Sequence, residues 1–318
     1  MYERFYNLRE RPFSLTPDPD YLYPSRFHRE TLNYLRYGIE GHAGFVVITG
    51  EIGSGKTTLL QTALRGLDHQ TSVARLINTN LDARELIESV MLDFGLDPQP
   101  GQSKPYLLRQ LANFLVSQRN AGRLALLVID EAQNLSPGAL EEVRMLSNIE
   151  TEKSKLIQVV MVGQPSLRTL LAAPQLEQLR QRITVSYHLQ PLDLADTHAY
   201  LNHRIRRASL GVPVEFPEDV SAILHRYSHG IPRTINVIAD AVLLFGYADE
   251  RHQLTPELAN EVIDELRSTG VIRDPAASAP APLPNDLNAA LALHAAGANG
   301  ATASNFGSAM GGRPAAAA

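Results

Sequence analysis

Cysteine is absent from the 318 residues of this sequence, which excludes disulfide bonds and every metal site built on thiolates. None of the ten histidines stands in the H-E-x-x-H spacing of a zinc hydrolase, and we assign no transition metal. A chain without cysteine is typical of a reducing compartment. We therefore expect a cytoplasmic protein.

Long apolar runs and a strong excess of one charge are also absent. No stretch of about 18 apolar residues occurs, so the sequence predicts no membrane-spanning helix. Residues 1–11 mix charged and aromatic side chains and lack the apolar region of a signal peptide. The formal net charge of −5 gives no general attraction to nucleic acid or to an anionic membrane. We expect contact with the inner membrane only through a partner.

One glycine-rich stretch carries the strongest functional signal. Residues 50–57 fit G-x-x-x-x-G-K-[ST], the phosphate-binding loop of nucleoside-triphosphate hydrolases. Glycine lets successive backbone N–H groups turn inward and line an anion site. Lys56 supplies a charge for the β- and γ-phosphates, and the Thr57 hydroxyl is a ligand for Mg²⁺. The predicted nucleotide-binding residues are Gly50, Glu51, Ile52, Gly53, Ser54, Gly55, Lys56, Thr57 and Thr58.

The segments around this loop fit the strand, loop and helix that the motif requires. Residues 45–49 are an apolar, β-branched run typical of a buried strand, and residues 58–64 read as a helix. Strands apolar on both faces that alternate with helices indicate a parallel sheet covered by helices. The sequence therefore predicts an α/β core with five parallel strands. The other four strands are expected at residues 73–78, 124–131, 156–163 and 183–187.

Beyond residue 191 the strand signal stops and only helical patterns remain. Val220, Ile223, Leu224 and Tyr227 follow the i, i+3, i+4, i+7 spacing of an amphipathic helix. The tail is rich in alanine, proline and glycine, and we expect it to be disordered. We divide the chain into a nucleotide-binding core with an N-terminal clasp, a small helical domain and this tail, at residues 1–190, 191–270 and 271–318.

The N-terminal 30 residues combine four prolines with seven aromatic residues, a composition unlike that of a disordered segment. We expect this segment to pack across the core domain, with part of it near the nucleotide base. A purely structural clasp is the alternative.

Two acids end the strand expected at residues 124–131. A carboxylate at Asp130 would hold Mg²⁺ through water. Glu131 would orient and polarise the attacking water, because the γ-phosphoryl group needs an in-line nucleophile. The alternative is a pair of solvated acids at the end of a strand.

Together these features resemble an AAA+ ATPase of the P-loop class. More narrowly, the chain is similar to the ATPase of the general secretion pathway protein A family, which includes relatives in pilus and exopolysaccharide loci. The resemblance covers residues 1–270. Besides the phosphate loop and the two acids, it depends on the sequences at residues 5–13, 17–19, 163–165, 181–183 and 230–233.

The resemblance implies two residues that sense the γ-phosphate. Gln164 follows the fourth strand, where AAA+ proteins keep a polar residue for this purpose, although Asn or Thr is commoner there. Arg233 resembles the second sensor, which reaches over the phosphates from a helical lid. Its alternative is an exposed arginine at the start of a helix.

The resemblance also implies an arginine finger, which stabilises transition-state charge in a neighbouring subunit. Arg182 lies just before the last strand, where the finger is expected, and Arg180 is its rival. The alternative for Arg182 is an ion pair with a nearby acid. Asn78 would hold Glu131 away from water until a partner binds, or else has no such role.

We therefore predict an Mg²⁺-dependent ATPase that couples ATP turnover to the assembly or remodelling of a protein client in envelope secretion, pilus or exopolysaccharide machinery. The finger implies assembly into a homo-oligomeric ring or filament. Two alternatives remain open: an ATP-switched DNA-binding regulator of the transposition-associated AAA+ type, and a non-hydrolysing adaptor, against which Glu131 argues. The basic run at residues 203–207 could contact nucleic acid or anionic lipid, or be a solvated helix face.

Overall fold

A five-stranded parallel sheet forms the centre of the core domain. The computed structural model describes residues 1–272 apart from residues 41–43, 68–70, 78 and 152–153. The strand order is β2-β3-β6-β1-β7. This arrangement confirms the predicted fold class. The strands are β1 (Phe45–Gly50), β2 (Thr71–Leu76), β3 (Leu124–Ile129), β6 (Gln158–Gly163) and β7 (Ile183–Leu189).

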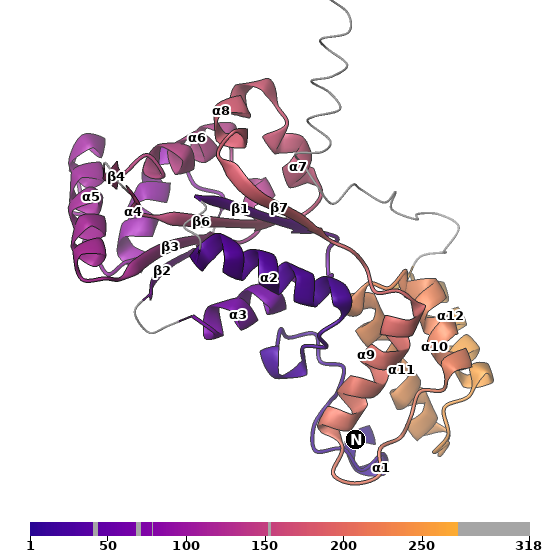
Figure 1. Cartoon of the computed structure of the whole chain (residues 1–318). Coiled ribbons are helices and arrows are strands. Elements are labelled where there is room, and N and C mark those ends of the chain that lie inside the picture. Colours follow the sequence, from indigo (N-terminus) through magenta and orange to yellow (C-terminus); the bar gives the residue numbers. More distant parts are fainter. Residues whose placement is uncertain (41–43, 68–70, 78, 152–153, 273–318) are drawn as a thin grey trace, which may run out of the picture.

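Helices cover both faces of this sheet, which is why its strands are apolar on both faces (Figure 1). In β1, Phe45 and Val47 join one hydrophobic cluster while Val46 and Ile48 join the other. On the Val46 face lie α2 (Arg26–Glu40) and α3 (Lys56–Arg65). The helices on the Phe45 face are α4 (Ala83–Asp93), α5 (Lys104–Asn120), α6 (Pro137–Leu146), α7 (Ser166–Leu171) and α8 (Glu177–Arg180).

Short elements complete the core. The Ser136 hydroxyl accepts a hydrogen bond from the Ala139 N–H at 3.1 Å and caps α6, whose first residue is Pro137. A two-stranded hairpin follows α6, which the sequence pattern does not predict. It pairs β4 (Glu150–Thr151) with β5 (Ser154–Lys155). Three 3₁₀ turns are η1 (Pro19–Tyr21), η2 (Ala132–Asn134) and η3 (Pro174–Leu176).

Four helices form the second domain beside the sheet (Figure 1). Thr255 caps the last of them by accepting a hydrogen bond from the Leu258 N–H. Within the part of the chain that the structure describes, no helix has the length and hydropathy needed to cross a bilayer. The tail expected from residue 271 lies outside the described residues from residue 273 onward. The helices are α9 (Leu194–Ala208), α10 (Glu218–Ser228), α11 (Pro232–Ala248) and α12 (Pro256–Ser268).

The N-terminal segment packs mainly on the helical domain, so the expectation that it lies across the core domain was wrong for its first part. This part begins with α1 (Tyr2–Phe5). The phenol of Tyr2 donates to Asp240 on α11, and that of Tyr6 donates to the Arg251 carbonyl at 2.9 Å. The buried side chains that join the helical cluster are Tyr2, Tyr6, Leu8, Phe13 and Tyr21.

Candidate functional site

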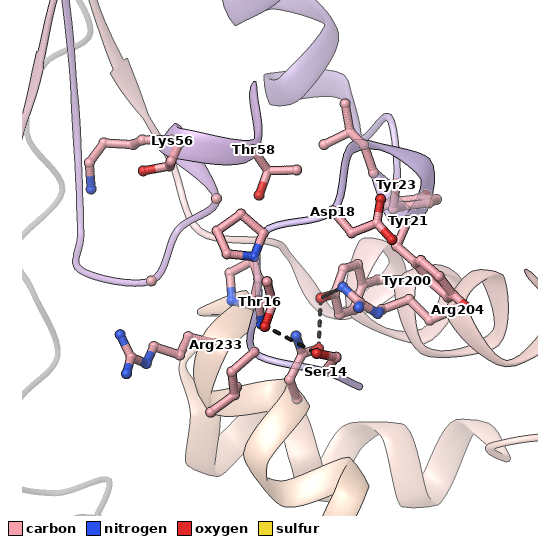
Figure 2. A pocket seen from close by; sticks show the side chains of 18 of the residues that line it. Ser14, Thr16, Asp18, Tyr21, Tyr23, Lys56, Thr58, Tyr200, Arg204 and Arg233 are labelled. Atoms are coloured by element: carbon pink, nitrogen blue, oxygen red, sulfur yellow. Dashed lines mark hydrogen bonds between the residues drawn. The ribbon is translucent and has the colours of Figure 1, made fainter. Parts of the chain in front are cut away.

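A cavity of about 220 Å³ lies where the core domain, the N-terminal segment and the helical domain meet. It borders the carboxyl end of β1, the edge of a parallel sheet at which α/β proteins hold ligands. Lys56 and Arg233 lie toward one end of the pocket in Figure 2, and Tyr21 and Arg204 toward the other. Its walls include residues 14–18 and 21–23, the loop between β1 and α3 with the first turn of α3, and His28, Glu131, Tyr200, Arg204, Arg233 and Asn236.

The loop between β1 and α3 has the conformation that its glycines permit. Gly53 and Gly55 have φ angles of +81° and +94°, a region that favours glycine. The backbone N–H of Arg233 donates to the Gly53 carbonyl at 3.1 Å. A Cβ on Gly53 would lie 2.4 Å from the Cβ of Arg233, so a glycine is also needed for this close approach. The first turn of α3 therefore presents free N–H groups at the pocket.

The ammonium group of Lys56 is buried inside this loop. Its Nζ donates to the carbonyls of Gly50 at 2.9 Å and Glu51 at 2.8 Å. Burial lowers the pKa of Lys56, while the nearby charges of Glu131 and Asp130 oppose that change. The third N–H of the ammonium group remains available for an anion at the helix terminus.

Thr57 and Asp130 come together, as the sequence predicts. The Thr57 hydroxyl donates to Oδ2 of Asp130 at 3.1 Å, which joins the start of α3 to the end of β3. A hydroxyl and a carboxylate are hard oxygen donors of the kind that Mg²⁺ prefers. Their contact means that a magnesium ion bound between them would have both ligands within reach, so these residues fit the predicted metal.

Glu131 adopts a left-handed conformation, with φ of +51°, two residues after the end of β3. Its Oε2 accepts hydrogen bonds from Nε2 of Gln133 at 2.6 Å and from Nε2 of Gln164 at 3.2 Å. The Oε1 of Gln133 in turn accepts from the Gln164 N–H at 3.0 Å. A Cβ on Gly163 would lie 2.7 Å from Oε1 of Gln133, so the Gly-Gln-Pro sequence leaves room for this bridge.

Gln164 was expected near the site, but Gln133 was not. In one sequence Gln133 looks like any polar residue of a short turn. Only the ends of β3 and β6, which are neighbouring strands, bring its side chain between Glu131 and Gln164. The two amides hold Oε2, one of the two carboxylate oxygens of Glu131.

The proposed second sensor and the two arginine-finger candidates occupy different places. Arg233 is exposed at the start of α11 and lines the cavity. Arg182 donates to the Ser147 hydroxyl at 3.2 Å, and Arg180 lies 3.9 Å from Glu177. Neither of the last two is among the residues that line the cavity of the same chain. A finger acts on a neighbouring subunit, so their role stays a prediction.

A second, open groove of about 490 Å³ borders Glu131 on the side of β2. Its lining comes from Ile77, Thr79, Asn80, Glu131 and Asn134. Asn78, expected to restrain Glu131, lies outside the described residues. Glu131 thus faces two openings, the cavity above the loop and this groove.

The basic run at residues 203–207 divides between the interior and the surface. Arg204 is buried, donates to the Pro12 carbonyl and to the Tyr200 hydroxyl, and stacks 4.9 Å from the centre of the Tyr21 ring. Arg206 and Arg207 are exposed. Arg204 therefore holds the N-terminal segment against α9. Of the three arginines in this run, Arg206 and Arg207 are left for contact with a polyanion.

Comparisons with known proteins agree with this geometry. The model of the AAA domain family matches residues 39–171. General secretion pathway protein A of Aeromonas hydrophila is 41% identical over 254 residues, which are 80% of this chain and 46% of that protein. The chain thus spans about half the length of this curated relative.

Solved structures match the fold at low sequence identity. The ORC2 protein of Aeropyrum pernix, in ADPNP–ADP complexes, is 19% identical with a TM-score of 0.60 over 80% of this chain and 71% of its own. Cdc6p from Pyrobaculum aerophilum is 18% identical with a TM-score of 0.56 over 80% of this chain and 70% of its own. At such identities the likeness concerns the fold alone.

Proposed function

The chain is an AAA domain protein similar to general secretion pathway protein A, and from this premise we propose that it binds ATP with Mg²⁺ and hydrolyses it. One observation carries the proposal. The Thr57 hydroxyl joins the phosphate loop to Asp130, and the next residue is Glu131, whose carboxylate is held by two amides through one oxygen. A phosphate-binding loop alone would support binding, whereas this pair supports turnover.

Binding of the phosphates falls to the loop and to Lys56. The N–H groups at the start of α3 and the positive end of its dipole favour an anion there. Lys56 is held over the loop by two carbonyls and can turn its ammonium group toward the β- and γ-phosphates. Thr57 and Asp130 would hold Mg²⁺, which supplies charge neutralisation for the phosphate oxygens.

Hydrolysis requires a water molecule aligned with the γ-phosphorus and a group that polarises it. Glu131 is the residue that we assign to this task. Gln133 and Gln164 hold its Oε2, and Oε1 would be the oxygen that accepts a hydrogen bond from the water. Gln164 is also the residue proposed to contact the γ-phosphate, and it would link that phosphate to the position of the carboxylate.

The helical domain acts as a lid over the same pocket. Arg233 begins α11, and its backbone N–H already contacts Gly53 of the loop. We propose that its side chain reaches the γ-phosphate when ATP is bound and that the lid relaxes after hydrolysis. Arg182, or else Arg180, would complete the site of a neighbouring copy in a ring or filament.

The client is proposed from the relative. General secretion pathway protein A is named for secretion, and we propose that this chain likewise couples ATP turnover to assembly of an envelope export machine, with the adenine preference taken from the same resemblance. The DNA-binding alternative gains no support from the basic run, since Arg204 serves packing.

The test replaces Glu131 by glutamine in the full chain, with Glu88→Gln on α4 as the matched control. Glu88 pairs with Arg84 and is not among the residues that line the cavity. Steady-state phosphate release should fall about 10²–10⁴-fold in Glu131→Gln, the range for general acid–base groups, while ATP binding persists. Turnover at the parental rate would contradict the assignment of Glu131.

A further inference from the structure

A buried histidine to which the proposed ATPase chemistry assigns no role lies against the phosphate loop and lines the same cavity. His28 stands in the first turn of α2 and is 4% exposed. Its ring lies against the loop: a Cβ on Gly55 would be 3.4 Å from Nε2 of His28. The ring also faces the backbone of Ser54. Gly55 is the residue from which α3 starts.

The other side of the ring contacts Ser25. The Ser25 hydroxyl lies 2.6 Å from Nδ1 of His28 and accepts from the His28 backbone N–H at 3.3 Å. Since that hydroxyl oxygen already accepts one hydrogen bond, its own hydrogen is free to bond Nδ1. A neutral imidazole has one N–H, which then falls on Nε2. This tautomer can donate to the Ser54 carbonyl.

The protonation state agrees with this arrangement. Burial lowers the pKa of His28 to about 4, so the ring is neutral near pH 7. The hydrogen bond to the Ser54 backbone raises the same pKa, as expected for a ring nitrogen that donates to a carbonyl. The N–H of Ser54 is also fixed, because it donates to the Glu51 carbonyl at 3.1 Å.

The chain before Ser25 is tied to the helical domain. The Tyr23 hydroxyl donates to Asp196 of α9 at 3.1 Å, and the ring of Phe13 packs edge-on against Phe216 at 5.7 Å. Most of the residues between these anchors line the cavity. Hence one segment contacts the lid at its start, the pocket in its middle and the phosphate loop, through His28, at its end.

We propose that His28 is a positioning residue that holds the Ser54–Gly55 part of the phosphate loop in its anion-binding form, oriented by Ser25 at the end of the lid-bound segment. This role rests on the proposed function, since the loop that His28 positions is the proposed nucleotide site. His28 also lines the cavity, so exchange of the nucleotide-free loop is the readout that separates positioning through Ser54 from direct contact with nucleotide. Its loss should free the loop and weaken phosphate binding, while leaving the sheet and the lid folded.

The test compares His28→Ala, His28→Gln and Ser25→Ala with His225→Ala in the full chain. His225 is a half-buried histidine of α10 whose ring bonds the Thr197 hydroxyl at 2.9 Å, far from the loop in sequence. Glutamine can place an amide N–H near the position of Nε2, so it should restore the bond to Ser54. The two readouts are deuterium exchange of residues 50–57 without nucleotide and the Kd for a fluorescent ADP.

We expect His28→Ala to speed exchange of the loop and to weaken ADP binding about tenfold, the effect of one lost hydrogen bond of about 1.4 kcal/mol. His28→Gln should return to within about threefold of the parent, and Ser25→Ala should fall between them. His225→Ala should change neither readout. Should His28→Ala fail to fold, Ser25→Ala and His28→Gln still decide the point.

Two results would overturn the inference. One is loop exchange in His28→Ala or Ser25→Ala equal to that of the parent. The other is a loss in His28→Gln as large as in His28→Ala, with His225→Ala equally affected, because binding would then follow general stability. The exchange readout needs no nucleotide, so a parent chain that bound no ADP would contradict the proposed function separately.

Discussion

The core domain and the helical domain complete their hydrophobic interiors by different routes. Each cluster in the core is built from strands and helices that follow one another along residues 32–187. The cluster in the helical domain needs side chains from the opposite end of the chain, among them Tyr2, Tyr6 and Phe13. The pocket lies between the two, so a change on the core side should alter chemistry while a change on the N-terminal side should alter stability.

The largest effect is expected from Phe13→Ala. Phe13 is 2% exposed and packs against Phe216, so truncation should lower the free energy of unfolding by about 3–5 kcal/mol, the usual range for a buried phenylalanine. Urea denaturation measures the change. Leu15→Ala, two residues away and 53% exposed, is the control and should stay within about 0.5 kcal/mol of the parent. Equal losses of unfolding free energy in the two variants would contradict the stabilising role that we assign to the buried N-terminal side chains.

On the core side, Lys56→Ala should remove nucleotide affinity with little loss of stability. Truncating one partner of a buried charge pair costs about 2–5 kcal/mol, so the Kd for ATP with Mg²⁺ should rise at least about 30-fold. Burial already disfavours the charge of Lys56, so the nucleotide-free protein should melt near the parental temperature. Arg65→Ala, at the exposed end of the same helix, should bind ATP normally.

Lowering the pH should destabilise the core domain more than the helical domain. Burial lowers the pKa values of His28 and His188 to about 4, and His188 bonds the Thr49 hydroxyl. Between about pH 6.5 and pH 4 these histidines are protonated in the unfolded chain but neutral in the folded core, so the free energy of unfolding falls as the pH falls. A tenfold difference in proton affinity between the folded and unfolded chains corresponds to about 1.4 kcal/mol of stability.

Deuterium exchange at pH 7 and pH 5 would resolve this loss by region. The strands next to His188 should show the larger increase in opening. Burial also lowers the pKa values of His203 and His225 in the helical domain, but their rings are only half-buried, so the loss there should be smaller. Uniform loss in both domains would mean that the buried histidines do not control the response to acid.

The smallest effect is expected from Gln133→Ala. Glu131 would lose its shorter hydrogen bond and keep the one from Gln164, so turnover should fall about tenfold, near 1.4 kcal/mol, while ATP binding is unchanged. Gln102→Ala, on an exposed loop, is the control. A change in Kd equal to the change in turnover would show that Gln133 serves the fold of the loop instead.

The same contrast explains what the sequence could predict. The strands could be predicted because an apolar run is a signal in consecutive residues that does not depend on distant contacts. The phosphate loop could be predicted because its chemistry requires a fixed local pattern of residues. Asp130 lies beside Thr57 because parallel strands end at one edge. The sequence does not show on which domain Tyr2 and Phe13 pack. Aromatic side chains indicate that a segment is packed, but they do not identify its partner. Gln133 and His28 depend on contacts between distant elements for the same reason.

A structure of the full chain with Mg²⁺ and a non-hydrolysable ATP analogue would test the account most directly. We predict the β- and γ-phosphates on the N–H groups of residues 53–57, with Nζ of Lys56 turned toward them. The metal should lie between Thr57 and the Asp130 carboxylate, with Glu131 facing the γ-phosphate. A triphosphate seated elsewhere, or an empty loop at saturating analogue, would contradict the account.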